Sequence, residues 1–535
     1  MQATSRVLAT TGAVFILSAF IISCSDSPPR SDEEVISPGT AESATPQTAA
    51  QTTPERTTAQ AITPGTGEPT TAQPARPGTA EPATPQPDTP QTAGRTISEP
   101  AAPEASRAGV NYYVRQTVGN DANDGLSPET AWEHIGKLST AMHAGDTAYI
   151  APGLYREQIT VLHDGAIDNR ITFIADPTGQ HTGDPPGVVM ITGADPVEPG
   201  TFRRSSAPGV YQYSPVPAHP IQGVVEMDGL QYRYTRARDT REHLLDGLSE
   251  LEVVNKLPYS FFYDQDTNVL HIHTSDGKSP DTHEIELIRR GNGISITAKH
   301  FVSVIGFTFR HMGDAGVNFF KQSGDGIAMD NTSYGGRQGI RVYNATNILV
   351  YRNTMFRNEN CGVYFAAQST NGSAIGNTAY ENIKGLRWSS DSVSGLAIDN
   401  ALFDNHEAGI SVEKAQRALL RRNRLVNNAK SQLLVIQAEY GSEDNCFETG
   451  SPDQLTADFV FTEHYKTLAE YQKARRQDLH SREGGCGPMP QKVDVRRLHA
   501  ETVAYAERAR DILSKAAKST EAATTPAGGK QGLPQ

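Results

Sequence analysis

The sequence predicts an all-β fold in which the chain winds into a solenoid of stacked coils, each of about 23 residues. The first observation is a repeat of glycines at this spacing, at Gly316, Gly339, Gly362, Gly385 and Gly409. The second is a repeat of asparagines, at Asn331, Asn353, Asn377, Asn400 and Asn423. The third is another asparagine series five residues later, at Asn358, Asn382, Asn405 and Asn428. Recurrence at such a period indicates a repeat architecture in which each coil stacks on the next.

Each coil has room for short strands and turns but not for two helices. Apolar residues recur at every second position before each asparagine, as at Leu349 and Tyr351, and after each glycine, as at Ile340 and Val342. A period of two predicts strands with one face inward, whereas helical repeats need roughly 33 residues or more. We expect the asparagines at the corners, where their side chains bond the turn backbone and stack on the next coil.

The N-terminus has the features of an export signal. An apolar run at residues 7–22 follows Arg6 and ends just before Cys24, and it is too short and wrongly flanked for an ordinary spanning helix. It resembles a bacterial lipoprotein signal peptide, which implies that residues 1–23 are removed and that Cys24 is lipidated. Ser25 resembles the residue that directs such proteins to the outer membrane. We therefore expect a lipid-anchored protein, periplasmic or surface-exposed; the alternative is an uncleaved anchor helix in the same compartment.

Residues 24–108 are expected to form a disordered tether behind the lipidated cysteine. They are almost entirely Thr, Pro, Ala, Glu, Gln, Ser and Gly, a composition that cannot form a core. The flexible-chain rule gives a reach of about 50 Å, which would hold the folded part away from the membrane. A net charge of −13 and a pI near 5.6 disfavour nucleic acid as a partner.

The folded part is expected at residues 109–481. Ile135, Leu138 and Met142 are at helical spacing, with Ser127 as a candidate N-cap, and predict a helix that covers the open end of the solenoid. A β-rich insertion is expected at about residues 201–290. Residues 482–518 are expected to contain an amphipathic helix and residues 519–535 to be a disordered tail.

The segment from Gly119 to Glu157 resembles the amino-terminal cap of right-handed parallel β-helix proteins of the pectate-lyase-like superfamily. The resemblance extends from Val110 to about Ser481 and includes the insertion. It implies a right-handed parallel β-helix and, because many members are secreted carbohydrate-active enzymes, a polysaccharide or oligosaccharide partner. Such folds include lyases, hydrolases, epimerases and adhesins, so the reaction must be inferred from the outward side chains.

Two carboxylates on adjacent coils are the candidate catalytic pair. Asp391 lies two positions beyond Ser389, one coil before Glu413, and strand geometry predicts a separation of roughly 5 to 8 Å between their carboxylates. Retaining and inverting glycosidases use separations in this range. The stretch from Leu386 to Asp391, followed by Gly409 to Glu413, resembles the catalytic coils of glycoside hydrolase family 120 β-xylosidases. That resemblance implies Asp391 as nucleophile and Glu413 as general acid/base.

The candidate substrate-binding residues surround this pair on the strands that follow the glycines. Outward positions on successive coils form columns, and we expect such a mixed polar and aromatic surface to hold a sugar ring. The candidates are Arg341, Tyr364, Arg387, Trp388 and Ser389.

Three alternatives remain open. Exposed Asp and Glu on a solenoid are often surface charge without a catalytic role. A polysaccharide lyase acting on a uronate-containing glycan would use an arginine or lysine base, and Arg337, Arg341 and Arg387 are available. A solenoid that only binds glycans, or an adhesin, would fit the long tether. No metal or cofactor is expected for a hydrolase, whereas a lyase would admit calcium. We expect a monomer.

The cysteines divide into a pair and a single residue. Cys446 and Cys486 enclose about 40 residues, and in an oxidising compartment we expect them to form a disulfide; two unrelated thiols are the alternative. Cys361 lies beside Gly362 and is expected to be a buried free thiol. His271 and His273 share a strand face, but without a third ligand nearby they are not expected to bind metal.

Overall fold

The computed structural model describes residues 108–216, 221–227, 232–233, 235–236, 247–460 and 462–524. The expected signal peptide, the lipidation site Cys24 and the tether lie outside these ranges. Within them, no helix is long and apolar enough to cross a membrane.

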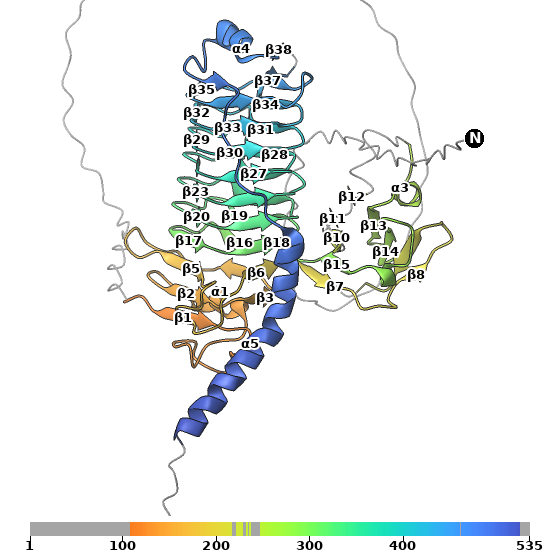
Figure 1. Cartoon of the computed structure of the whole chain (residues 1–535), viewed down its shortest axis with the longest axis vertical. Helices are drawn as coiled ribbons and strands as arrows, with labels where there is room; N and C mark the ends of the chain where they lie inside the picture. The colour runs from red at the N-terminus through yellow and green to blue at the C-terminus, as the bar shows by residue number, and fades with distance from the viewer. Residues whose placement is uncertain are drawn as a thin grey trace, which may run out of the picture. The chain divides into compact units, whose positions relative to one another are not determined.

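The structure confirms the predicted parallel β-helix. Coils stack into three sheets of ten strands each, which we call sheets A, B and C (Figure 1). Sheet A consists of β1 (Asn111–Val114), β2 (Thr147–Ile150), β5 (Ile171–Ala175), β17 (Val302–Ile305), β20 (Ile327–Met329), β23 (Leu349–Tyr351), β26 (Ser373–Ile375), β29 (Leu396–Ile398), β32 (Ala418–Arg421) and β35 (Tyr440–Glu443). Sheet B consists of β3 (Gly153–Tyr155), β6 (Val189–Thr192), β18 (Thr308–Arg310), β21 (Thr332–Tyr334), β24 (Thr354–Phe356), β27 (Thr378–Tyr380), β30 (Ala401–Phe403), β33 (Arg424–Val426), β36 (Cys446–Glu448) and β39 (Arg482–Glu483).

Sheet C is built from the strands that follow the recurrent glycines. It consists of β4 (Ile159–Val161), β16 (Asn292–Thr297), β19 (Ala315–Phe320), β22 (Gln338–Tyr343), β25 (Cys361–Ala366), β28 (Lys384–Trp388), β31 (Ala408–Glu413), β34 (Ser431–Ile436), β37 (Leu455–Phe459) and β38 (Glu463–Tyr465). Neighbouring strands pair in parallel, except that β38 turns back on β37 and closes the sheet. Side chains alternate inward and outward along each strand, so one continuous apolar core runs through the stack.

The recurrent glycines are explained by close packing. A Cβ atom on Gly339 would lie 2.5 Å from the carbonyl oxygen of Gly362 and 2.4 Å from the Met355 side chain. Only glycine lets the chain enter sheet C at this spacing.

The asparagines form the predicted corner ladder. Asn377 Nδ2 donates to Asn400 Oδ1 at 3.0 Å and to the Val350 carbonyl at 2.9 Å. Its Oδ1 accepts from the backbone N–H and the amide of Asn353, at 2.9 and 3.1 Å. Since Asn377 is fully buried, each rung satisfies backbone groups of a corner that water does not reach.

Replacing Asn377 with alanine should lower the free energy of unfolding by about 1–3 kcal/mol, because buried donors and acceptors lose their partners. Urea unfolding of the purified protein measures this. Thr346 is the matched control, since its hydroxyl bonds that of Thr370 at 2.9 Å in an exposed ladder. Thr346→Ala should cost less than about 0.5 kcal/mol, and equal losses for the two variants would contradict a stabilising role of the buried ladder.

Short helices cover both ends of the stack. At the lower end a 3-10 turn (Ile135–Lys137) leads into α1 (Leu138–Ala141), and Ile135, Leu138 and Met142 are buried as predicted. The expected N-cap at Ser127 is wrong, because its hydroxyl and carbonyl accept from Thr130 in a turn before the helix. At the upper end α4 (Leu468–Arg475) begins with a capping box between Thr467 and Glu470.

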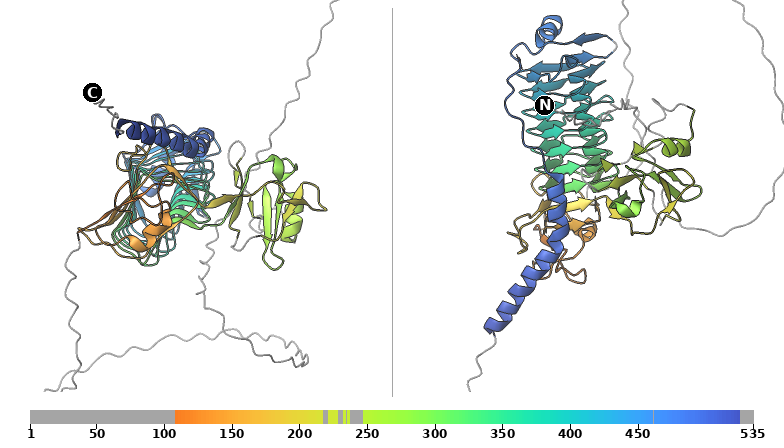
Figure 2. Two further views of the ribbon diagram at one scale, coloured as in Figure 1. Left: turned by 90° about the horizontal axis from the view of Figure 1, so that it is seen from below. Right: turned by 45° about the vertical axis from the view of Figure 1, so that its right-hand side comes forward.

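The predicted β-rich insertion is a pair of small sheets. One contains β7 (Ala194–Pro196), β10 (Gly223–Glu226), β11 (Tyr232–Arg233) and β15 (Ile285–Ile288). The other contains β8 (Arg203–Arg204), β9 (Val210–Tyr213), β12 (Thr235–Arg236), β13 (Ser260–Asp264) and β14 (Val269–His273), with α3 (Glu250–Lys256) packed on β13 and β14. A 3-10 turn (Pro280–Thr282) precedes β15. The insertion projects from the side of the stack (Figure 2).

Buried ion pairs join the insertion to the β-helix. Glu286 of β15 is fully buried and pairs with Arg310 of β18 at 3.1 Å and with Arg156 at 2.9 Å. His499 of the C-terminal helix lies 3.1 Å from Arg310. The contacts connect three segments that are distant in the sequence.

The C-terminal segment runs back along sheet B. Cys446 and Cys486 are joined by a disulfide, while Cys361 is a buried free thiol. The segment then covers a stack of aromatic rings on the outside of sheet B, formed by Tyr334, Phe356, Tyr380 and Phe403. It continues as α5 (Val495–Thr524), which begins beside the lower part of the stack and extends beyond its end (Figures 1 and 2). The helix passes the predicted boundary at residue 518, because the alanine-rich sequence there favours helix.

Candidate functional site

The candidate site lies on the outward surface of β19, β22, β25, β28 and β31, which we call the sheet C face. The register stacks Arg341, Tyr364, Arg387 and Ser411 on successive strands. Four of the predicted site residues, Arg341, Tyr364, Arg387 and Glu413, are therefore brought onto one surface, as the alternation predicts. Ser389 follows β28 and reaches the same surface through a contact with Tyr364.

Glu413 is the centre of a buried ion cluster. Its carboxylate accepts from Lys384 Nζ at 2.7 Å, from Arg387 Nη2 at 2.5 Å and from Ser411 Oγ at 2.5 Å. Its side chain is only 11% exposed, and those of Lys384 and Arg387 are 5% and 4% exposed. We call these four residues the Glu413 cluster. Burying ions on the outward side of a strand costs stability, and such arrangements are typical of functional sites.

The cluster fixes the charge of its members. Burial acts to raise the pKa of Glu413, but the charges of Lys384 and Arg387 outweigh it and lower this pKa to about 2. Burial acts to lower the pKa of Arg387, yet the Glu413 carboxylate outweighs it and raises this pKa further above its usual range. At neutral pH Glu413 is therefore an anion and Arg387 a cation. A carboxylate with this pKa does not suit the predicted role of general acid.

Sequence reasoning missed Lys384 and a third carboxylate. Lys384 Nζ also lies 3.5 Å from Glu407, which in turn lies 3.3 Å from Lys430. Lys384 stands immediately before Gly385 at the start of its strand, and its side chain crosses to the next coil. The repeat could have indicated Lys384, because it occupies the same position in its coil as Gln338 and Cys361 do in theirs.

Tyr364 and Ser389 complete one side of the cluster. Ser389 Oγ donates to Tyr364 Oη at 3.1 Å, and the Arg387 guanidinium lies 5.0 Å from the centre of the Tyr364 ring. Both residues are buried. The cation–π contact holds Arg387 against Glu413, and the Ser389 hydroxyl fixes Tyr364.

Asp391 lies at the corner after β28, next to the coil that carries Glu413. Its backbone N–H donates to the carbonyl of Lys414 at 2.9 Å. Ser390 and Asp391 both have left-handed backbone conformations, with φ of 53° and 62°, and Asp391 is exposed. The backbones of the two predicted residues thus lie on neighbouring coils, but their side chains have opposite environments: that of Asp391 is exposed, whereas that of Glu413 is buried and ion-paired.

The predicted role of Trp388 in substrate binding is wrong. Its side chain is 1% exposed and lies in the core, where its ring stacks on that of Phe365 at 4.8 Å. In β28 the side chain of Trp388 points inward, between the outward residues Arg387 and Ser389. Strand alternation therefore explains why Trp388 is buried in the core.

Arg341 lies farther down the same surface. Its guanidinium pairs with Asp314 at 2.5 Å and lies 5.0 and 4.5 Å from the ring centres of Phe320 and Tyr343. This places a neutralised cation between two aromatic rings.

Two clusters of side chains elsewhere in the described residues contain groups of the kinds that bind metal ions. Glu443, Asp444 and His480 have ligand atoms close together, but Arg421 already pairs with Asp444 at 2.8 Å. His271 stacks on Phe262, and His273 Nδ1 lies 2.7 Å from the Val254 carbonyl oxygen.

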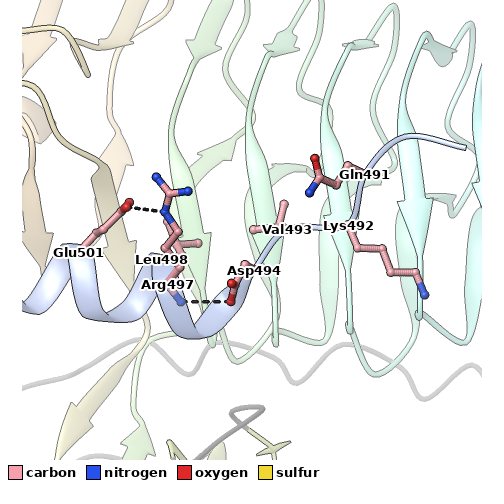
Figure 3. Close-up of a pocket in the computed structure, with 7 residues that line it drawn as sticks. All are labelled: Gln491, Lys492, Val493, Asp494, Arg497, Leu498 and Glu501. Atoms are coloured by element: carbon pink, nitrogen blue, oxygen red, sulfur yellow. Dashed lines mark hydrogen bonds and ion pairs between the residues drawn. The ribbon is translucent and has the colours of Figure 1, made fainter.

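A shallow hollow of about 310 Å³ lies beside the start of α5 (Figure 3). Arg497 pairs with Glu501 at 2.7 Å, and Asp494 accepts from the backbone N–H of Arg497. Lys492 pairs with Glu381 and Asp404 at 2.7 and 2.8 Å. The pairs of Lys492 fasten the C-terminal segment to the β-helix. We assign the hollow no ligand.

Replacing Lys384 with methionine should raise the pKa of Glu413 from about 2 toward its usual value, because one of two neighbouring cations is lost. The carboxyl ¹³C shift of Glu413, followed by NMR between pH 2 and 7, measures this pKa. Lys492→Met is the matched control, since Lys492 pairs with carboxylates on another sheet. A Glu413 titration unchanged by Lys384→Met would show that the ion pair does not set its charge.

Comparison with known proteins gives a partial family match. The profile of the NosD family, described as a periplasmic copper-binding protein, matches residues 272–447, about a third of the chain. No curated protein matches the sequence significantly.

Several solved structures are similar in part. A structure of XylC in complex with xylose is 15% identical, with a TM-score of 0.49, and the match covers 64% of this chain and 66% of that one, just under two thirds of its length. Pectate lyase Pel9A is 11% identical, with a TM-score of 0.39 and coverage of 67% and 74%. A GH136 lacto-N-biosidase from Eubacterium ramulus is 11% identical, with a TM-score of 0.36 and coverage of 65% and 62%. By its own topology and contacts, the protein is a parallel β-helix with a buried ion cluster on the outward side of sheet C.

Proposed function

We propose that the protein is a carbohydrate-active enzyme that hydrolyses glycosidic bonds on the sheet C face. The observation that carries this proposal is the Glu413 cluster, in which an ionised carboxylate is held by two buried cations on the outward side of a strand. A sheet that served only as scaffold would not need buried charge there.

In the proposed reaction the two carboxylates take the opposite roles to those expected from the sequence: Glu413 is the nucleophile and Asp391 the general acid/base. Glu413, ionised at neutral pH, attacks the anomeric carbon and forms a bond to it. Asp391 relays a proton from solvent to the leaving glycosidic oxygen as the old bond breaks. Water then displaces Glu413, and its proton returns to solvent through Asp391. Lys384 and Arg387 keep Glu413 ionised, and Tyr364, fixed by the buried Ser389 hydroxyl, supports Arg387.

A uronate lyase is the second candidate, because Arg341, Lys384 and Arg387 place three cations on one surface. Each is already paired with a carboxylate. The raised pKa of Arg387 opposes a role as base, since a base must first lose its proton. The hydrolase therefore fits this surface better.

Product analysis on a panel of plant and algal polysaccharides and aryl glycosides distinguishes the candidates. Hydrolysis releases reducing ends without new ultraviolet absorbance. A lyase releases unsaturated products that absorb near the ultraviolet edge, and a glycan-binding protein or adhesin releases neither. Absorbing products, or none from any substrate of the panel, would overturn the proposed hydrolase.

We further propose that the protein acts at the cell envelope. The signal-like residues 1–23 and Cys24 support a lipid anchor, and the composition of the following residues supports a flexible tether. Such an anchor would let a monomeric enzyme reach insoluble polysaccharide.

A further inference from the structure

We propose that the surface around Arg341 is a subsite for a neutral, hydroxyl-rich sugar unit rather than for a uronate. This inference rests on the proposed function, because it names the substrate class of the same face. The subsite consists of Asp314, Asn318, Phe320, Gln338, Arg341 and Tyr343.

The charge of the subsite is already balanced. Asp314 lies 2.5 Å from Arg341 Nη1, and their side chains are 23% and 13% exposed. The carboxylate of a uronate would have to compete with Asp314 for the same guanidinium. The two cations farther up the face are satisfied in the same way, since Lys384 and Arg387 both pair with Glu413. The buried part of the face therefore offers an acidic sugar no net attraction.

The subsite also contains buried polar atoms that need partners. Asn318 and Gln338 are 4% and 3% exposed, and among the described residues Asn318 Oδ1, Gln338 Oε1 and Arg341 Nε have no hydrogen-bond partner. Such atoms are rare in folded proteins and indicate an additional ligand or water. Two acceptors and one donor match hydroxyl groups, which both donate and accept.

The strand register brings these groups together. Asn318 of β19 pairs with Arg341 of β22, so both point outward in one column, and Gln338 begins β22 in the column of Cys361 and Lys384. Phe320 and Tyr343 are the next outward pair along these strands and are partly exposed. Their rings supply apolar surface for the face of a sugar.

The subsite and the Glu413 cluster lie on one line along the stack. Arg341 and Arg387 are two strands apart, which corresponds to about 10 Å. A glycan chain that crosses the strands of sheet C would contact both, with one sugar unit at Glu413 and another at Arg341.

Binding measurements with the full chain test the subsite without requiring turnover. Isothermal titration with cellohexaose, xylohexaose and hexagalacturonate should show binding of at least one neutral oligosaccharide and at least tenfold weaker binding of the uronate. Asp314→Asn should release Arg341 and strengthen hexagalacturonate binding at least tenfold. The control Asp330→Asn removes an exposed partner of Arg352 on a distant corner and should change neither affinity.

A second variant separates a sugar subsite from a site that holds only water. Asn318→Ala should weaken binding of the neutral oligosaccharide about tenfold while the protein remains folded by circular dichroism. Unchanged binding by Asn318→Ala would indicate that the site holds a buried water only, and it would overturn the proposal. The proposal would also be overturned if the parent bound hexagalacturonate in preference to the neutral oligosaccharides, or bound none of the three. If Asp314→Asn and Asn318→Ala do not change the cleavage of a substrate that the parent cleaves, only the subsite is overturned. If the expected binding pattern is found but no substrate is cleaved, only the hydrolase is overturned.

Discussion

Replacing Glu413 with glutamine should reduce hydrolysis of any glycan that the parent cleaves by about 10⁴-fold or more, because the amide cannot form the covalent intermediate. Asp391→Asn should behave differently. A glycoside whose leaving group needs no proton should still react with Glu413, while natural glycosides with poor leaving groups should stall. Comparison of initial rates on an activated aryl glycoside and on a polysaccharide measures this difference.

The matched control for these variants is Glu381→Gln. Glu381 is also a partly buried, ion-paired glutamate, held by Arg357 and Lys492 at 2.7 Å each, but it lies at a corner beside sheet B. Its replacement should leave the rate unchanged. If Glu413→Gln and Asp391→Asn both keep full activity, the pair has no catalytic role and the arginines of the face become the candidates. If Asp391→Asn alone removes activity on the activated substrate, the roles predicted from the sequence are restored.

Glu286→Ala should be strongly destabilising, lowering the free energy of unfolding by about 3–5 kcal/mol. Glu286 is fully buried, and its loss would leave the buried Arg310 without its carboxylate and remove a partner of the partly exposed Arg156. Urea unfolding at pH 7 measures the loss. The control Glu501→Ala removes an exposed partner of Arg497 and should cost less than about 1 kcal/mol.

The same carboxylate makes stability depend on pH. Burial acts to raise the pKa of Glu286, but His311, Arg310 and Arg156 outweigh it and lower the pKa to about 2. Because the folded pKa lies below the unfolded value, this stabilisation is present above roughly pH 4.5 and is lost as the pH falls toward 2. Glu286→Gln should flatten this part of the stability profile. An unchanged slope between pH 5 and 2 would contradict this assignment.

The fold could be predicted from the sequence because the same residues occur at the same place in successive coils. The same close packing and the same hydrogen bonds therefore recur in each of them. Each coil has the same glycine at a close approach, as at Gly339, and the same asparagine at a corner, as at Asn377. Alternation within each strand also predicted which side chains of sheet C face outward. The inclusion of Trp388 among the binding residues departed from that alternation, and the structure corrects it.

The environment of the site was less predictable, because it depends on side chains that reach across coils. The low pKa of Glu413 comes from Lys384 and Arg387 of the preceding coil, and no local pattern shows how far a lysine extends. Glu407 was missed for the same reason. Likewise the pairing of Glu286 with Arg310 depends on how the insertion packs on the stack.

A crystal structure of the Glu413→Gln variant, soaked with an oligosaccharide from the polysaccharide that the parent degrades best, tests the central claim most directly. The account predicts an ordered sugar on the sheet C face, over the Glu413 cluster, with its glycosidic oxygen within hydrogen-bonding reach of Asp391. A sugar ordered on another sheet or on the insertion, with the sheet C face empty, would contradict the account.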